Sequence, residues 1–446
     1  MNKKENKISK EIRINKKSAR KNYSNQTGIT LIALVVTIVV LLILAGVSLN
    51  AIFSENGIIK RAQDAQNKMD QAAENDQKGI NELSNWLDSK INGNSGGNTT
   101  GGNTTGGDDN PTTTTTKIST LVGKVVDKNT KAEDIYGNKI TIPKGFKVVA
   151  HGTAAGSATY TYSGDNIPAV QDGIVIENGT DKNQFVWVPV GTIKNKNNTT
   201  NTITLGRYEF DITGELKSTT PAQVASVENC TKIVTISKDE TDYQELSTSR
   251  ISSSSSENTT ARNLAEFIST TLANGGYYIA RFEASGTTSK IASKYDQTVL
   301  TRITQPNAAK AAREMYGEVK EKNELVYASD LVNSYAWDTA IIFIQIYSEK
   351  TDYASYNETI TTGKFTATGK NNDKYCNIWD MSGNALEWTT EYSTTSSSSF
   401  FYPCVYRGGC FVTAIGRAGD CTSYRNYDDT TLSGSDIGLR PLLYVK

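Results

Sequence analysis

The sequence predicts an α+β protein with a long N-terminal membrane or pilin-type helix, a flexible linker and one large globular domain. Three observations predict this arrangement. An uncharged apolar run occupies 29–49, a stretch of Gly, Thr and Asn occupies 92–116, and short strand-like runs with two helical stretches fill 117–446. A chain of 446 residues is too long for one ordinary domain and has room for all of these units.

Charge is unevenly distributed along the chain. Residues 1–28 contain nine Lys or Arg against two acids, which leaves 38 basic and 45 acidic residues and a net charge of −7 on the remainder. A mildly acidic body has no electrostatic reason to bind nucleic acid. A basic leader before an apolar run indicates membrane targeting, with the leader in the cytoplasm and everything after Asn50 outside the cell.

The apolar run is long enough to cross a bilayer. From Ile29 to Leu49, 21 residues carry no charge, and at about 1.5 Å per residue this helix covers the roughly 30 Å hydrocarbon core. A secretory signal peptide is the competing interpretation. Its apolar region would be shorter and would be followed by a small-x-small cleavage site.

A basic leader that ends in Gly28, followed by ITLIALVVTIVV, resembles the N-terminus of type IV prepilins. The resemblance implies cleavage after Gly28 by a prepilin peptidase and methylation of the new N-terminal residue, Ile29. It also implies a helix that first anchors the protein and later packs with other pilin subunits. The family usually has glutamate at the fifth mature position, where this chain has Ala33, and this difference bears on fibre assembly.

Two segments connect the predicted span to the globular domain. Apolar residues near helical spacing continue through 59–87, which extends the predicted helix as a stalk over 29–91. This thin stripe either packs against a partner helix or leaves the stalk solvated. The Gly/Thr/Asn segment 92–116 cannot bury a core and predicts a flexible coil that spans roughly 25–30 Å.

From Lys117 onward the chain has enough apolar and aromatic residues for a sizeable core. Strand-like runs dominate, among them KITIPKGFKVVA, QFVWVPVGTI and GYYIARFEAS. Two stretches predict helices: PNAAKAAREMYGEV, with Pro306 near its first turn, and SDLVNSYAWDTAIIFIQIYS, with Ser329 as the N-cap. The polar runs 249–260 and 393–400 predict surface loops.

Four pieces of this region occur in a fixed order. They are GGYYIARFEAS, YAWDTA, NIWDMSGNALEWTTEY and a final group of YRGGCF, YRN and DIGLRP. Together they resemble the formylglycine-generating enzyme/sulfatase-modifying-factor family, whose core is a variant of the C-type lectin fold. The resemblance covers about 118–446, with its strong motifs after 275, and implies a C-type lectin-like domain over 117–446.

The segment DMSGNALEW contains the densest set of polar residues in these motifs. Gly383 and Asn384 suit a tight turn with positive φ, and Asp380 and Glu387 flank it. Oxygen donors gathered by one tight loop suit Ca²⁺. In the family calcium binds here, and the resemblance implies as ligands the side chains of Asp380 and Glu387 and the main-chain carbonyls of Gly383 and Ala385. The alternative is a Glu387 that hydrogen-bonds to backbone without a metal.

The large side chains near these motifs predict packing and structural roles. We expect the four tryptophans Trp187, Trp337, Trp379 and Trp388 in the core, and Arg440 in a structural ion pair. Tyr424 and Arg425 are expected to belong to the scaffold as well.

The residues that would supply redox chemistry are missing from the pattern. The family's oxygen-dependent enzymes bind copper with two nearby cysteines after a GGS motif, and other branches bind iron with histidines and carboxylates. Here Cys410 takes the serine position, the next cysteine is Cys421, and the single histidine is His151. This spacing does not match a thiolate pair for Cu(I), and one histidine cannot build a multi-histidine site. The sequence predicts no catalytic residue and neither copper nor iron.

The segment between RGGC and DIGLRP is polar and loop-like. In the family it lies across the top of the domain, and in retroelement-diversified proteins on this scaffold the variable residues cluster there. An ordinary surface loop is the alternative. The candidate ligand-binding residues are Phe411, Thr413, Ile415, Arg417, Asp420 and Thr422.

These observations predict a pilin-like, membrane-anchored surface protein that displays a non-catalytic lectin-fold domain. Its function would be recognition or adhesion, with an extracellular ligand that the sequence does not identify. Two alternatives stay open. One is a minor pilin with a purely structural role, and the other is a formylglycine-generating-type oxidase or other enzyme with a displaced cysteine pair.

Overall fold

The computed structural model describes residues 115–150, 168–228, 230, 235–238, 241–247, 260–321, 324–358, 364–395, 403–411 and 421–446. They belong to one compact unit, Asn110–Lys446. The predicted leader, membrane helix and stalk, and His151, lie outside these residues. Within the described ranges, none of the helices combines the length and apolar character needed to cross a bilayer.

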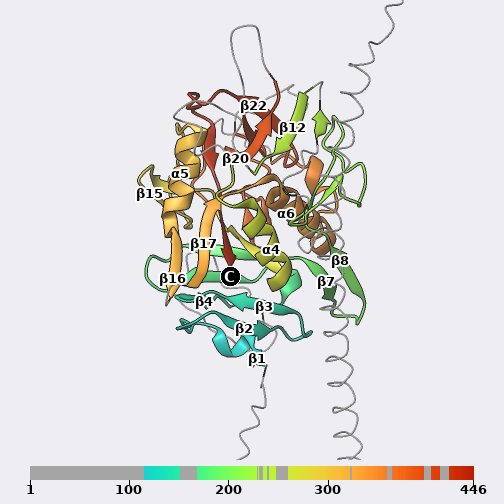
Figure 1. Ribbon diagram of the computed structural model, residues 1–446, viewed down its shortest axis with the longest axis vertical. Helices are drawn as coiled ribbons and strands as arrows, with labels where there is room; N and C mark the ends of the chain where they lie inside the picture. The colour runs from blue at the N-terminus through green and yellow to red at the C-terminus, as the bar shows by residue number, and fades with distance from the viewer. Residues whose placement is uncertain are drawn as a thin grey trace, which may run out of the picture. The chain divides into compact units, whose positions relative to one another are not determined.

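A seven-stranded antiparallel sheet forms the centre of the domain (Figure 1). Its order is β16 (Glu318–Glu321), β17 (Glu324–Leu331), β24 (Pro441–Val445), β13 (Gly276–Ala280), β6 (Gln184–Pro189), β5 (Val175–Asn178) and β4 (Phe146–Val148). The strand nearest the end of the chain, β24, therefore lies between β17 and β13.

Each face of this sheet packs against a hydrophobic core. Successive side chains of a strand point to opposite faces, so neighbouring residues join different cores. On one face, Val186 and Val188 of β6 and Ile279 of β13 join a core with α4 (Leu264–Asn274) and α6 (Ser334–Tyr347). On the other face, Trp187 and Tyr278 join a core with a small sheet of β1 (Thr116–Lys117), β2 (Thr130–Glu133) and β3 (Lys139–Ile142). This explains why QFVWVP is apolar without alternation.

A second sheet lies at the top of the domain in Figure 1, at the end opposite the small sheet of β1, β2 and β3. Its order is β11 (Ile236–Lys238), β12 (Thr241–Glu245), β20 (Leu386–Ser393), β21 (Cys404–Arg407) and β22 (Arg425–Asp428), and β23 (Ile437–Leu439) pairs in parallel with β20. A third core joins this sheet to α5 (Gln305–Tyr316), with Trp388 and Leu439 against the alanines of the helix.

Short ribbons and turns complete the described part. The two-stranded ribbons are β7 (Gly191–Lys194) with β8 (Thr200–Ile203), β9 (Gly206–Arg207) with β10 (Gln223–Val224), β14 (Ser285–Thr287) with β15 (Lys290–Ala292), and β18 (Lys374–Tyr375) with β19 (Ile378–Trp379). The 3₁₀ turns are η1 (Ile118–Leu121), η2 (Val170–Asp172) and η4 (Tyr353–Ser355). The described residues are thus mostly sheet with few helices, which confirms the mixed α and β prediction in its coarse form.

The helix ends differ in part from the sequence prediction. Helix α5 has Pro306 in its first turn, as predicted. Helix α6 begins five residues after Ser329, and Asn333 is its N-cap, with a side chain that accepts a hydrogen bond from Ala336 N at 2.9 Å. The prediction of Ser329 as the cap is wrong because β17 continues through Leu331, where it still pairs with β24.

Helix α4 was not predicted. Its sequence, LAEFISTTLAN, contains two Thr and a Ser that favour other conformations. Caps and packing stabilise it instead: the Asn263 side chain accepts a hydrogen bond from Glu266 N at 3.1 Å, and Gly275 ends the helix with a left-handed φ of 73°. Phe267 and Ile268 fix one side of the helix in the core.

Candidate functional site

The four ordered motif pieces meet inside the domain. Arg440 of DIGLRP donates to both carboxylate oxygens of Glu387 in DMSGNALEW, at 2.8 and 2.6 Å, and to the main-chain oxygen of Ala280 in the first piece at 2.9 Å. Glu283, also from the first piece, accepts a hydrogen bond from Ala385 N at 2.8 Å. Residues separated by up to 160 positions in sequence therefore form one hydrogen-bonded hub.

YAWDTA meets the final group of motifs in a second buried hub. Asp338 accepts hydrogen bonds from Arg407 of YRGGCF and from Arg425 of YRN, each at 2.7 Å. Glu391, which follows DMSGNALEW on β20, pairs with Arg207 at 2.7 Å and with Arg407 at 3.2 Å. All five side chains are buried. Burial would raise the pKa of Glu391, but Arg425, Arg407 and Arg207 hold that pKa at about 2.

A structural role was expected for Arg425, but neither Asp338 nor Glu391 was singled out from the sequence. Both stand in the motifs quoted above, Asp338 within the apolar run of α6 and Glu391 within the strand LEWTTEYS, which is not apolar. A charged residue inside an apolar run is the signal that points to a buried ion pair.

The turn in DMSGNALEW is tight, but its strained positions are Asp380 and Asn384, with φ of 62° and 69°. The expectation that Gly383 adopts a positive φ is wrong. Glycine is required there for space, because a Cβ at that position would lie 2.9 Å from the main-chain oxygen of Glu358. The Asn384 side chain donates to Glu283 and accepts a hydrogen bond from Thr366 N at 3.0 Å, which stabilises its left-handed backbone.

The acidic side chains around this turn have protein donors. Asp380 accepts hydrogen bonds from Gly369 N at 2.8 Å and from the Asn371 side chain at 2.9 Å. Asp373 accepts a hydrogen bond from the hydroxyl of Tyr353 at 2.9 Å. These bonds tie residues 369–373 to the turn and to Tyr353.

Four buried carboxyl groups surround the single guanidinium of Arg440: Glu283, Asp373, Asp380 and Glu387. Burial is the largest cause that raises the pKa of each of them, and neighbouring carboxylates add to the effect for Glu283, Asp380 and Glu387. The pKa of Asp380 rises to about 7. The hub therefore holds protons at a pH where exposed carboxyl groups would be ionised.

These contacts do not fit a calcium ion at the four implied ligands. Both oxygens of Glu387 are engaged by Arg440, a cation that would repel Ca²⁺. Asp380 is held by two protein donors. In the described part of the chain, no group of three or more Asp, Glu, His or Cys side chains is arranged to hold a metal ion. Gly383 and Ala385 lie beside the hub, and these contacts favour the alternative in which Glu387 acts without a metal. Experiment has to decide between the two.

The cysteines within the described residues are free thiols. Cys404 and Cys410 are buried, and so is Cys421. Burial raises the pKa of Cys404 and of Cys376 far above the ordinary thiol value. These two thiols are protonated at neutral pH, so neither supplies the thiolate that nucleophilic or copper chemistry uses.

The two ends of the candidate ligand segment are fixed to the frame. Phe411 N donates to the main-chain oxygen of Asn384 at 2.9 Å, and the Phe411 ring packs on Phe365 with centroids 4.2 Å apart. Thr422 is buried, its N–H donates to Tyr356 O at 3.0 Å, and its own carbonyl accepts from Trp337 Nε1 at 2.9 Å. Thr422 is therefore an anchor, not a surface contact.

The other candidate residues of this segment, Thr413, Ile415, Arg417 and Asp420, lie outside the described residues, as do the processing residues Gly28 and Ile29. Of the tryptophans expected in the core, Trp187, Trp337 and Trp388 are fully buried, as predicted. Trp379 is half-buried, against Phe282 and Lys374.

No family model matches the chain, and no curated protein matches it. Among solved structures, a crystal structure of CarF is similar over 38% of this chain and 87% of that chain, with 15% identity and a TM-score of 0.27. Treponema denticola variable protein 1 is similar over 60% of this chain and 97% of that chain, with 10% identity and a TM-score of 0.25. Scores of this size do not establish a shared fold, so the C-type lectin assignment stays a prediction.

Proposed function

We propose that this protein is a non-catalytic recognition or adhesion protein at the cell surface. In this proposal the chain is cleaved after Gly28 by a prepilin peptidase, the helix 29–91 anchors it or packs with other pilin subunits, and 92–116 is a spacer. The domain from 117 has a C-type lectin-like fold and presents the segment 411–422 to an extracellular ligand.

The convergence of the ordered motifs carries the domain part of this proposal. Glu387 pairs with Arg440, and Asp338 pairs with Arg407 and Arg425, so the polar residues of the motifs are used to join distant pieces of chain. Buried pairs of this kind stabilise one arrangement of the pieces, because a lone buried charge is costly. The motifs therefore act as a frame, which is what a display domain needs.

The anchoring of 411–422 supports this segment as the presented surface. Phe411 and Thr422 bond to Asn384 and Tyr356 of the frame, so the intervening residues begin and end on rigid supports. Sequence changes between two such anchors leave the frame intact. A binding surface whose ligand preference changes between related proteins requires this tolerance of sequence change.

The thiols argue against the enzyme alternative. The pair that this alternative requires, Cys410 and Cys421, consists of two buried free thiols. Cys410 stands at the position of the family's GGS serine and is 4% exposed. A copper- or iron-dependent turnover by the purified protein would overturn the non-catalytic proposal.

The test is a replacement of residues 412–420 by a Gly-Ser segment of equal length in the full-length protein. We expect loss of binding in a screen of host cells, matrix proteins and glycans, with surface display unchanged. A matched control replaces the exposed turn 195–199 between β7 and β8 in the same way, and it should bind normally. Binding that survives the replacement would remove the segment from the proposal. Pili that fail to assemble without any ligand being found would favour the minor-pilin alternative.

A further inference from the structure

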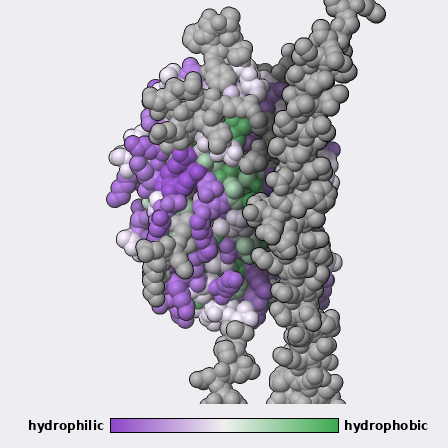
Figure 2. All heavy atoms as spheres, in the orientation of Figure 1, coloured by the Kyte–Doolittle hydropathy of each residue, from purple (hydrophilic) through white to green (hydrophobic). Residues whose placement is uncertain are grey.

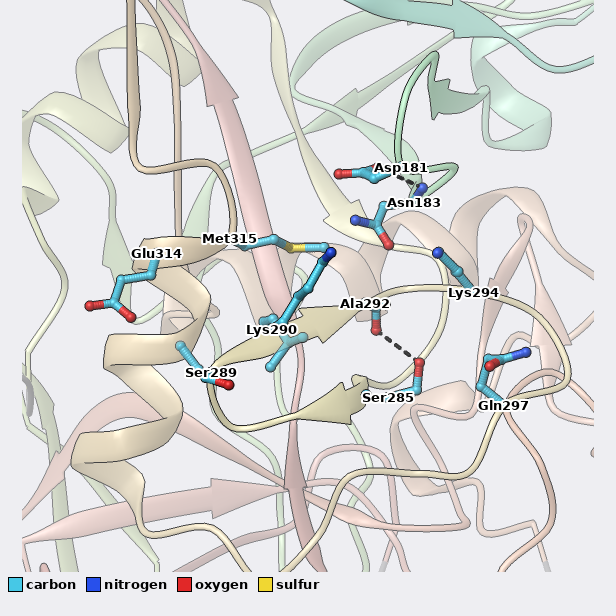
Figure 3. A pocket seen from close by; sticks show the side chains of 13 residues that line it. Asp181, Asn183, Ser285, Ser289, Lys290, Ala292, Lys294, Gln297, Glu314 and Met315 are labelled. Atoms are coloured by element: carbon cyan, nitrogen blue, oxygen red, sulfur yellow. Dashed lines mark hydrogen bonds between the residues drawn. The ribbon is translucent and has the colours of Figure 1, made fainter.

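A cavity of about 310 Å³ lies between three elements on the α5 side of the domain (Figure 3). The hairpin of β14 and β15 forms one wall, α5 forms the second, and the turn after β5 forms the third. This volume lies at the lower end of the range for small-ligand sites and is large enough for one pyranose ring with its substituents. In Figure 2 the surface on this side is mostly hydrophilic.

Two ammonium groups reach this cavity. Lys290 on β15 extends towards Met315, and Lys294 lies on the side of Asn183 (Figure 3). Within the described residues neither lysine has an ion-pair partner. Two unpaired cations beside one cavity favour a ligand that carries negative charge.

Hydrogen-bond acceptors and an apolar patch complete the lining. One carboxylate oxygen of Asp181 accepts from Asn183 N at 3.0 Å and from the Tyr316 hydroxyl at 3.1 Å, which holds the group in place and leaves its second oxygen for a ligand. Ala311 and Met315 of α5 supply apolar surface. Acceptors beside an apolar patch suit hydroxyl groups on a ring whose C–H face also needs contact.

Charge decides between classes of anion. Asp181 and Glu314 line the same cavity as the two lysines, but Glu314 pairs with Lys310 at 4.0 Å. Two lysines against the carboxylate of Asp181 leave an excess of one positive charge. A dianion such as phosphate would exceed this positive charge and would meet repulsion from Asp181. A ligand with one negative charge and several hydroxyl groups fits better, because the lysines can bind the charge and Asp181 can accept hydrogen bonds from the hydroxyl groups.

We infer that this cavity binds one acidic monosaccharide unit, of the uronic acid type, through its carboxylate and hydroxyl groups. Lys290 and Lys294 bind the carboxylate, Asp181 accepts from ring hydroxyls, and Met315 contacts the ring face. The lining contains no residue of 411–422. The inference therefore does not depend on the ligand surface of the proposed function.

The test is calorimetric titration of the full-length protein in non-ionic detergent with methyl β-D-glucuronide. We expect a dissociation constant of about 1 mM, as for a small polar ligand with few contacts. The double variant Lys290→Gln with Lys294→Gln should weaken binding about ten-fold or more, because it removes both charge-assisted hydrogen bonds. Lys124→Gln, at an exposed lysine outside the cavity, is the matched control and should bind as the unaltered protein does.

Two comparison ligands sharpen the result. Methyl β-D-glucoside, which lacks the carboxylate, should bind about ten-fold more weakly. Inorganic phosphate should not compete at equal concentration. Absence of glucuronide binding, an unchanged affinity in the double variant, or phosphate competing as well as glucuronide would each overturn the inference. None of these outcomes affects the test on residues 412–420.

Discussion

Glu387 and Arg440 form a bidentate ion pair in which neither side chain is exposed to solvent. The pair joins β20 to the residue that precedes β24, and so it connects the two sheets. Arg440→Met should destabilise the domain by about 3–5 kcal/mol, because Glu387 would lose its buried partner. Urea unfolding followed by tryptophan fluorescence measures this loss.

The double variant Glu387→Met with Arg440→Met serves as the control for that measurement. It removes both charges and should lose less stability than the two single variants together. Lys117→Met, at an exposed pair with Glu133, should change stability by about 1 kcal/mol or less. Equal losses for the buried and exposed pairs would contradict the structural role given to Arg440.

The four buried carboxyl groups around Arg440 should make the stability of the domain fall as the pH rises from about 4 to about 7. The pKa of Asp380 lies at about 7 in the folded state against 3.8 ordinarily, so the folded state binds more protons in this window. Stability linked to such a group is present at low pH and is lost as pH rises through the folded pKa. Asp380→Asn should flatten this dependence in urea titrations at pH 4.5, 6.0 and 7.5.

Glu391 should act in the opposite direction at lower pH. Its pKa is held at about 2 by three arginines, so its contribution is present above the ordinary value of 4.5 and is lost as the pH falls towards 2. Glu391→Gln should therefore cost most at neutral pH, where the unaltered protein has the full ion-pair network. A cost that does not depend on pH would contradict the assignment.

Gly408 in the RGGC motif should tolerate no side chain. Its φ is 84°, and a Cβ there would lie 2.7 Å from the main-chain oxygen of Met381. Gly408→Ala should destabilise the domain by more than about 2 kcal/mol, since a clash adds to the backbone strain. Gly317→Ala is the matched control: its φ is also positive, at 63°, but the space around it is open. It should cost less than Gly408→Ala, because backbone strain alone opposes the new side chain. Thermal unfolding distinguishes the two.

Removal of calcium should leave the melting temperature unchanged, because Arg440 already supplies the positive charge that Glu387 needs. The measurement compares thermal unfolding in EDTA and in millimolar CaCl₂. A rise of several degrees with calcium would restore the ligand set of Asp380, Gly383, Ala385 and Glu387. Asp380→Asn should then abolish that rise.

Processing is tested by mass spectrometry of the N-terminus. We expect a mature chain that begins with N-methylated Ile29 in cells with a prepilin peptidase, and the unprocessed chain in cells without it. Gly28→Val should block cleavage. A mature N-terminus at any other residue would contradict the prepilin resemblance.

The sequence indicated the elements of this domain better than their ends. The apolar run in QFVWVP and the Pro306 start of α5 were readable because burial and helix starts have local signals. The N-cap of α6 was not, since pairing of β17 with β24 places Ser329 in a strand. Such long-range pairing has no local signal.

The site was predictable to a similar degree. The motif order singled out Glu387 and Arg440, and their ion pair agrees with the role expected for Arg440. The partners of Asp380 could not be foreseen, because Gly369 and Asn371 belong to a connection without a motif. The cavity beside α5 was missed because it is formed by three separate segments, none of which is unusual in composition.

The place of β24 between β17 and β13 has a consequence for how this protein is made. Until residues 441–445 have emerged, the central sheet consists of two unconnected halves, and Glu387 has no arginine beside it. The central sheet can therefore be completed only after β24 has been synthesised. A premature stop codon at position 440 would leave the central sheet in two parts and Glu387 without its arginine, because it removes Arg440 and the whole of β24.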